Sequence, residues 1–251
     1  WLNVFFSYIP FFIVTILLKR YGFNFYRLVF FSGVRTIVQL IFLYFILDKL
    51  FKSDHFIVLL CVAFFMVMVA SYTVFKRIDS YSFSKLKWII FFSILSSVLL
   101  VGSYSICIVF KDGDVFDLPR TIPIVGLIIG NSLTGVSIAL DCFLTDVFRK
   151  KNEIEQKLIF GATVWEAMHH HVNRGMKMGL QPITNSMLTV GLVSIPGMMS
   201  GQLIAGEQPE KAALFQMSIL FMIFMSTLTA IFFALFLVLR SVMDVKKNCY
   251  A

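Results

Sequence analysis

Seven apolar segments follow one another along this chain with short polar breaks between them. Their approximate ranges are 2–18, 28–47, 56–75, 88–110, 121–141, 183–205 and 212–239. A helix needs about 20 apolar residues to cross the hydrocarbon core of a bilayer. Because 59% of the residues are apolar and only 14% are charged, a soluble core could not bury this much hydrophobic surface. We therefore expect an all-α, polytopic integral membrane protein with about seven transmembrane helices in one domain over residues 1–251.

The basic residues gather on one side of these segments. Most of the Lys and Arg fall in the loops near residues 19–27, 76–87, 149–177 and 240–247, which share one face of the membrane if seven segments cross it. The positive-inside rule then places the amino terminus outside and the carboxyl terminus in the cytoplasm. Because this arrangement accounts for the net charge of +8, we expect no nucleic acid partner.

One predicted loop is long, and it has a helical pattern. Within residues 142–182, apolar positions such as Ile154 and Leu158 recur at helical spacing, the pattern breaks at Gly161, and it resumes at Trp165. Two short helices around a glycine turn fit this pattern, forming a cytoplasmic hairpin at about 146–180. The pattern alone leaves two interpretations open, a docking surface for a soluble partner or an amphipathic hairpin at the membrane interface.

Polar side chains inside the apolar segments are the candidates for function, because they are costly in lipid unless they face protein or water. Arg35 lies about 10 Å inside the cytoplasmic end of the second segment at ~1.5 Å per residue. Asp141 lies at a comparable depth in the fifth segment. We predict that Arg35 and Asp141 form a buried ion pair, with either a structural role or a role in transport.

The fifth segment mixes small and polar residues near the middle of the membrane. Gly126, Gly130 and Gly135 alternate with Asn131 and Ser132. Small residues let helices approach closely. This segment therefore either makes a tight helix contact with an internal hydrogen bond or lines a translocation path.

The sixth segment contains the loop-like string GLVSIPGMMSGQ at residues 191–202. Pro196 removes a backbone donor and the glycines soften the same region, so the helix is expected to be kinked or broken there. Broken helices are tolerated in a membrane where they are buried in protein or line a wet cavity, as in transporters; the alternative is a passive kink. The predicted path-lining residues are Gln39, Asn131, Ser132, Asn185, Ser194, Pro196, Met198, Met199 and Gln202.

No metal site follows clearly from the sequence. Met198 and Met199 are weak candidates to bind a soft metal through their thioether sulfur, but methionine is more often a filler of apolar space. The run from His169 to His171 resembles a metal cluster, yet consecutive residues on a helix point about 100° apart and cannot all face one ion. We predict a solvated helix face for this run.

Enzyme signatures are missing from the chain. It contains no GxxxxGK[ST] phosphate loop, no HExxH and no GxSxG. We expect no catalytic residues and no cofactor in this chain, so energy for any transport comes from a partner or an ion gradient.

Several of these stretches resemble one family. The strings IPIVGLIIGNSLTGVSIAL at 122–140, NSMLTVGLVSIPGMMSGQLIAG at 185–206, RTIVQL at 35–40 and FQMSILFMI at 215–223 are similar to the FetB-type iron-export permeases, which are related to the plant aluminium-sensitivity permeases. The resemblance covers about residues 28–240. It implies a permease domain in the cytoplasmic (inner) membrane of a bacterium.

The resemblance also implies partners and a mechanism. Members of this family are membrane subunits of ABC-type exporters. They are expected to form homodimers and to bind a separate cytosolic ATPase that holds ATP and Mg. They are expected to move a metal ion out of the cytoplasm, with iron as the first candidate. The stretch around Glu155 looks like the coupling helix that docks on such an ATPase. The proline that usually closes this motif is absent, and Arg174 stands at its place. The ATPase-coupling residues implied by the resemblance are Glu155, Gly161, Ala162, Thr163 and Trp165.

Two other functions stay open at the level of the sequence. A carrier driven by an ion gradient needs no ATPase partner. A membrane scaffold or assembly factor moves no solute, so substitution of Asn131 or Pro196 would leave cellular metal content unchanged.

Overall fold

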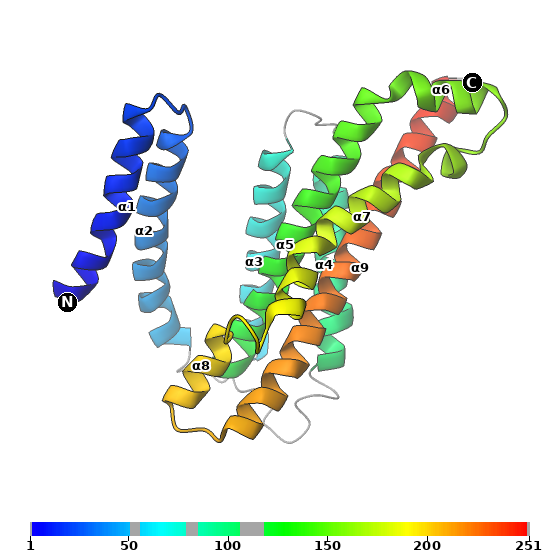
Figure 1. Ribbon diagram of the computed structural model, residues 1–251. Helices are drawn as coiled ribbons and strands as arrows, with labels where there is room; N and C mark the ends of the chain where they lie inside the picture. The colour runs from blue at the N-terminus through cyan, green and yellow to red at the C-terminus, as the bar shows by residue number, and fades with distance from the viewer. Residues whose placement is uncertain (1, 51–55, 79–84, 106–117, 250–251) are drawn as a thin grey trace. The chain divides into compact units, whose positions relative to one another are not determined.

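The computed structural model describes residues 2–50, 56–78, 85–105 and 118–249, and within these residues all regular secondary structure is helical (Figure 1). The helices are α1 (Leu2–Arg20), α2 (Tyr26–Leu50), α3 (Phe56–Arg77), α4 (Leu86–Tyr104), α5 (Leu118–Arg149), α6 (Lys151–Ile159), α7 (Val164–Thr189), α8 (Gly197–Ile204) and α9 (Pro209–Cys249). The prediction of an all-α fold is confirmed. The chain divides into two compact units, Trp1–Asp54 and His55–Ala251, and each is described by itself.

Five helices in the described part of the chain are long and apolar enough to cross a membrane. They cover Tyr26–Ile46, Ile57–Arg77, Leu86–Tyr104, Thr121–Arg149 and Pro209–Ser241, and each coincides with a predicted segment. The first predicted segment falls on α1, whose side chains at residues 2–7 are outside the described set. The sixth is not one continuous helix. A multi-pass membrane protein is therefore supported, while the number seven and the orientation stay predictions.

The first unit is a hairpin of α1 and α2. Gly22 closes its turn with a φ of 75°, in the left-handed region that favours glycine. The ring of Phe11 packs directly on Gly33, where any larger residue would collide with it. The membrane-length window of α2 buries none of its residues within the described chain. This apolar helix therefore depends on lipid or protein to cover its surface.

The second unit is built around the close packing of α5, α7 and α9, which run side by side in Figure 1. A Cβ atom added to Gly179 of α7 would lie 2.7 Å from the carbonyl oxygen of Gly135 and 2.8 Å from the Cβ of Ala139, both on α5. One turn earlier, a Cβ on Gly175 would lie 3.0 Å from the carbonyl oxygen of Ala139. The glycines thus allow the backbones of α5 and α7 to touch, which is the tight contact predicted for Gly135.

The two helices predicted around a glycine turn within residues 142–182 are present as α6 and the start of α7, but the neighbouring helices are longer than predicted. Helix α5 continues to Arg149, because no helix-breaking residue follows Asp141 within that stretch. Helix α7 has 26 residues rather than forming a short helix, and it carries Pro182 without ending there. Helix α9 has 41 residues, about 60 Å at ~1.5 Å per residue, which is longer than the ~30 Å hydrocarbon core of a bilayer.

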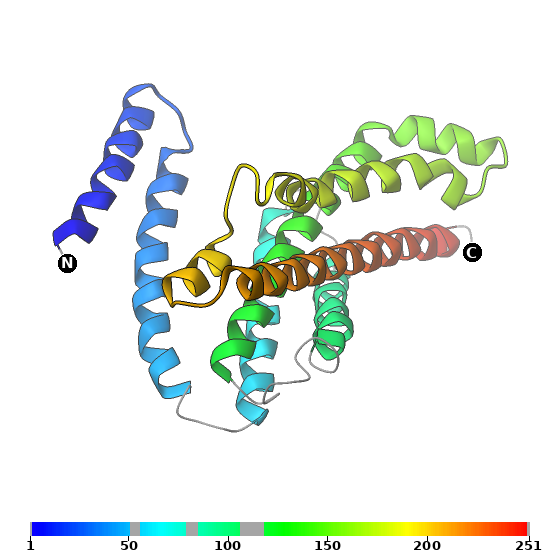
Figure 2. The ribbon, with the colours of Figure 1, turned by 60° about the horizontal axis from the view of Figure 1, so that its bottom comes forward.

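The predicted interruption of the sixth segment is confirmed. Residues 190–196 form no helix and link α7 to α8, as Figure 2 shows. Gly191 begins the break with a φ of 80°, and its N–H donates to the carbonyl oxygen of Ser194 at 2.9 Å. Pro196 is the N-cap of α8. The glycine therefore turns the chain out of α7, and the proline, which suits the start of a helix, begins α8.

Candidate functional site

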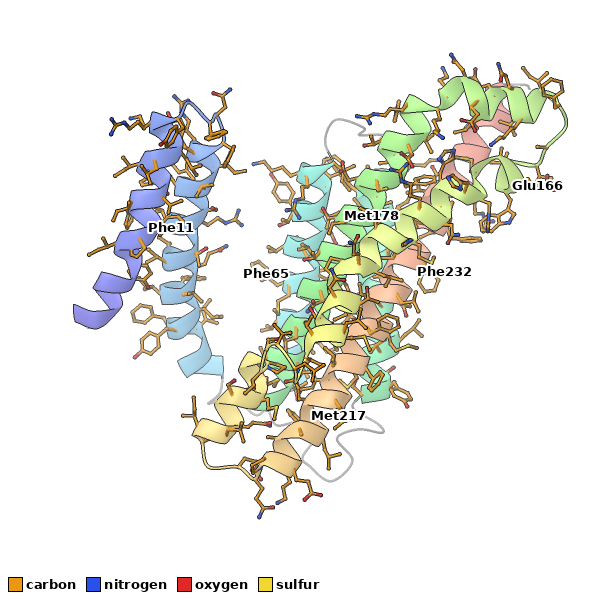
Figure 3. All side chains as sticks on the ribbon, viewed as in Figure 1. Phe11, Phe65, Glu166, Met178, Met217 and Phe232 are labelled. Atoms are coloured by element: carbon orange, nitrogen blue, oxygen red, sulfur yellow. The ribbon has the colours of Figure 1, made fainter. Side chains whose placement is uncertain are left out.

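The hairpin of α6 and the start of α7 is shaped by its short connecting turn. Gly161 has a φ of 91°, which only glycine adopts without strain. Thr163 then begins α7 in a capping box: its hydroxyl accepts from the backbone N–H of Glu166 at 3.2 Å, and the Glu166 carboxylate accepts from the N–H of Thr163 at 2.8 Å. The Thr163 N–H and the Thr163 hydroxyl both donate to the Glu166 carboxylate at 2.8 Å and lower the pKa of Glu166, which Figure 3 labels beside the turn. The predicted turn at Gly161 therefore results from two local features, the positive φ of this glycine and the capping box of Thr163 and Glu166.

The end of this hairpin carries exposed apolar side chains. Ile159 is 81% exposed, Phe160 is 89% exposed and Trp165 is 50% exposed; we call these three residues the hairpin tip. The flank of α6 is charged instead. Glu155, a predicted coupling residue, is exposed and pairs with Lys151 at 3.8 Å.

A cluster of three polar side chains connects the last turns of α5 to the first half of α7. Arg174 Nη1 lies 3.2 Å from Asp146 Oδ2, and His171 Nδ1 lies 3.8 Å from the same oxygen. The Asp146 side chain is 13% exposed, that of His171 is 1% exposed, and that of Arg174 is 56% exposed. Among the residues that the structure describes, neither ring nitrogen of His171 has a hydrogen-bond partner. Sequence reasoning missed this cluster, and for His171 the predicted solvated face is wrong, whereas His169 and His170 are exposed.

Acidification is expected to destabilise the fold through His171. Burial lowers the pKa of its ring from the usual 6.5; Lys150 and His170 lower it further, and Asp146 acts in the opposite direction. The unfolded chain therefore binds more protons than the folded chain below about pH 6.5. Stability is full above that pH and falls as the pH drops toward the folded pKa.

Thermal unfolding in detergent, followed from pH 7.5 to 5.5, tests this expectation. The variant His171→Gln should lose most of the pH dependence, and His170→Gln, a change at the exposed neighbour, should keep it. An unchanged slope in His171→Gln would contradict the assignment.

The predicted path residues of α5 differ in their surroundings. The Asn131 amide donates to the carbonyl oxygen of Leu127 in its own helix at 2.8 Å. Ser132 is fully buried, with its hydroxyl 3.4 Å from that of Ser226 on α9. Ser132 thus makes a hydrogen bond between helices, which fits the alternative interpretation of this segment as a tight helix contact. Asn131 is partly exposed.

The residues of the break and of α8 lie together at one end of α7 and α9. Asn185 and Ser194 are exposed, and Met199 is half-buried. Met198 packs on two apolar clusters of the core that also contact Phe215, which agrees with a filler role.

Two glutamine oxygens are buried near this end. Gln202 Oε1 on α8 and Gln216 Oε1 on α9 have no hydrogen-bond partner within the described residues, and α8 packs on α9. Buried amide oxygens without a partner are rare and call for an explanation. Gln202 was predicted from the sequence and Gln216 was not, although it is a polar residue within an apolar span.

The predicted pair of Arg35 and Asp141 spans the two units. Arg35 and Gln39 belong to the first unit and Asp141 to the second, and all three side chains are exposed within the described chain. The pair therefore stays a prediction.

Residues 1–243 match the model of a family described as "Uncharacterised protein family (UPF0014)". The chain belongs to the UPF0014 family. A UPF0014 membrane protein of Synechocystis is 31% identical over 84% of this chain and 81% of the relative. The "Probable iron export permease protein FetB" of Escherichia coli strain K12 is 30% identical over 82% of this chain and 78% of the relative. The resemblance seen in the sequence is confirmed.

UPF0014 relatives also occur in plants. "Protein ALUMINUM SENSITIVE 3" of Arabidopsis thaliana is 29% identical over 76% of this chain and 68% of the relative. A bacterial membrane therefore stays a prediction for this chain. No solved structure matches it.

Proposed function

We propose that this UPF0014 protein is the permease subunit of an ATP-driven exporter that moves a metal ion out of the cytoplasm. Iron is the first candidate for this ion. The single observation that carries the proposal is the apolar hairpin tip at the end of a charged hairpin. The name of the Escherichia coli relative, a probable iron export permease, supports the choice of iron. Homodimerisation and a cytosolic ATPase that binds ATP and Mg belong to the same proposal.

The hairpin tip suits a protein partner better than a lipid surface. A helix that lies on a membrane presents an apolar stripe along its length, whereas α6 is only nine residues long and carries the ion pairs Lys151–Glu155 and Lys157–Glu153 on its exposed sides. Its exposed apolar groups are concentrated at the turn instead. Aromatic residues in such a compact patch are the usual anchors of protein interfaces.

Helix α7 connects the hairpin tip to the interrupted segment. It is one helix from Val164 to Thr189, and residues 190–196 follow directly. The contact of Gly179 with α5 holds its middle, and the Asp146–Arg174 pair holds it closer to the hairpin. Helix α7 carries Pro182 between the Gly179 contact and the break, so a movement imposed by the ATPase at the tip would reach the break through one helix that can bend at this proline.

The break, α8 and the helices α5 and α9 supply polar groups that suit a cation. The partly exposed Asn131, the exposed Ser194 and the unpartnered oxygens of Gln202 and Gln216 are neutral oxygen ligands, the type that hard and borderline metal ions accept. In the proposed cycle of alternating access, ATP binding shifts α7 and exposes these groups to the opposite side of the membrane.

The direct test is reconstitution of the chain in liposomes together with the cytosolic P-loop ATPase of its source organism. Inside-out vesicles should accumulate iron when ATP is added outside, and iron should stimulate ATPase activity more than manganese or zinc does. Metal movement without the ATPase, driven by an imposed proton gradient, would support a carrier instead. If no metal moves under either condition, the remaining interpretation is a membrane scaffold that transports no solute.

Gln216→Leu is expected to reduce metal transport at least tenfold without weakening the fold. The substitution removes a buried oxygen that has no partner in the described part of the chain, and an unsatisfied buried acceptor costs about 1–3 kcal/mol, so thermal stability should stay equal or rise. Transport and melting temperature are measured on the same preparation. Gln208→Leu, at an exposed position before α9, is the control. A stable variant with full transport would remove Gln216 from the path.

A further inference from the structure

An apolar groove of about 380 Å³ lies between α3 and α4, outside the elements used for the proposed function. Figure 3 labels Phe65 on α3, one of the two helices that form it. Its lining includes Phe64, Met68, Tyr72, Phe75, Lys87 and Trp88. Several of these large side chains, such as Tyr72 and Trp88, are more than half exposed in the second unit. Such a surface needs an occupant.

One end of the groove is cationic. Lys87 Nζ lies 4.5 Å from the centroid of the Phe75 ring, so the ammonium group is held over an aromatic face at the end of the groove. Lys76 and Arg77 end α3, and Lys85 precedes α4. Neither α3 nor α4 contains an acidic residue. An anionic group is therefore favoured at this end.

The rest of the groove offers an apolar surface of defined length. From Phe75 to Phe64 along α3 the rise is about 16 Å, close to half of the ~30 Å hydrocarbon core, which is the depth of one leaflet. The Ser71 hydroxyl donates to the carbonyl oxygen of Val67 at 2.7 Å, so it needs no partner from the groove. Phe64 and Phe91, whose ring centroids are 5.8 Å apart, form the wall at the inner end.

We propose that this groove binds an anionic phospholipid, with one acyl chain along α3 and α4 and the headgroup phosphate on the Lys87 ammonium. Both helices are candidate membrane spans, so lipid reaches the groove directly. Tyr72 and Trp88 are residue types that prefer the headgroup level, and they flank the cationic end. By the positive-inside rule this is the cytoplasmic leaflet, where anionic lipid attracts basic residues. The proposal does not depend on the transported solute or on an ATPase.

Trp88 makes the site measurable. The chain has three tryptophans, and the variant Trp1→Phe/Trp165→Phe leaves only Trp88 as a fluorophore. This protein is reconstituted in bilayers of phosphatidylcholine and phosphatidylglycerol in which one lipid carries a brominated, quenching acyl chain. The quenching of Trp88 by brominated phosphatidylglycerol should correspond to a local concentration of this lipid about fivefold above its mole fraction in the bilayer.

Two substitutions complete the test. Lys87→Gln should remove the enrichment, so that both brominated lipids quench according to their mole fractions. Lys151→Gln, an equal change of charge on the hairpin, should leave the enrichment unchanged. Quenching proportional to mole fraction in the unsubstituted background would overturn the proposal, because it shows only bulk lipid. Absence of quenching by either lipid would also overturn it, because protein, either the first unit or a second copy, then covers the groove.

Discussion

Phe160→Ser is expected to weaken the binding of the proposed cytosolic ATPase to the detergent-solubilised chain at least thirtyfold. Truncation of a buried aromatic anchor at an interface costs about 2 kcal/mol or more. Phe160 is 89% exposed in the isolated chain, so nothing in the fold holds its ring. The loss of binding should therefore come without a change in melting temperature, since surface substitutions away from special features stay within about 0.5 kcal/mol.

Binding is measured by titrating the labelled ATPase onto the immobilised permease, and ATPase stimulation is measured in parallel. Asn152→Ser, at an exposed polar position of the same hairpin, should bind as the unsubstituted chain does. Normal binding by Phe160→Ser would place the ATPase contact elsewhere. Failure of the unsubstituted chain to bind would instead contradict the proposed function itself.

Gly179→Ala is expected to destabilise the protein by about 1–3 kcal/mol, the range for overpacking a core. The new methyl group would meet the carbonyl oxygen of Gly135 at 2.7 Å and the Cβ of Ala139 at 2.8 Å. Neither atom belongs to a flexible side chain, so α5 and α7 must move apart. Gly179→Leu should give little folded protein at all. Melting temperature and the yield of monodisperse protein are the measurements.

Gly130→Ala on α5 is the matched control. A Cβ at this position would meet nothing within 4 Å. Alanine is a better helix former than glycine by about 0.8–1 kcal/mol, so this change should be neutral or stabilising. The same substitution therefore has opposite expected signs at two helical glycines. A stable Gly179→Ala variant would show that the two backbones do not touch as closely as described.

The helices could be predicted because hydropathy alone reports them. The break after Thr189 was also readable, since Gly191 and Pro196 stand where a continuous helix would need neither. The lengths of α5 and α7 were not readable. Residues 142–182 are mixed in polarity because one side packs on neighbouring helices while the other stays exposed. Hydropathy alone therefore does not show where the helices in this stretch begin and end.

The site residues that were missed depend on tertiary contacts. Asp146 and Arg174 are 28 positions apart, and only the antiparallel packing of α5 and α7 brings them together. Gln216 is a polar residue within an apolar segment, but its spacing does not show that its side chain is buried against other helices rather than exposed. Ser132 was assigned to a path because it is polar at mid-membrane, but its partner Ser226 lies on α9, beyond the reach of any spacing rule within one segment.

In the proposed exporter, the contact of Gly179 with α5 would be the pivot of α7. From Gly179 the helix extends about 22 Å back to Val164 and about 15 Å forward to Thr189 at ~1.5 Å per residue. If α7 rotates about that point as a rigid lever, a displacement of about 3 Å at the hairpin tip moves the start of residues 190–196 by about 2 Å in the opposite sense. In the proposed exporter, the ratio of the two arms, set by the position of Gly179, would then determine how far the break moves for a given displacement of the hairpin tip.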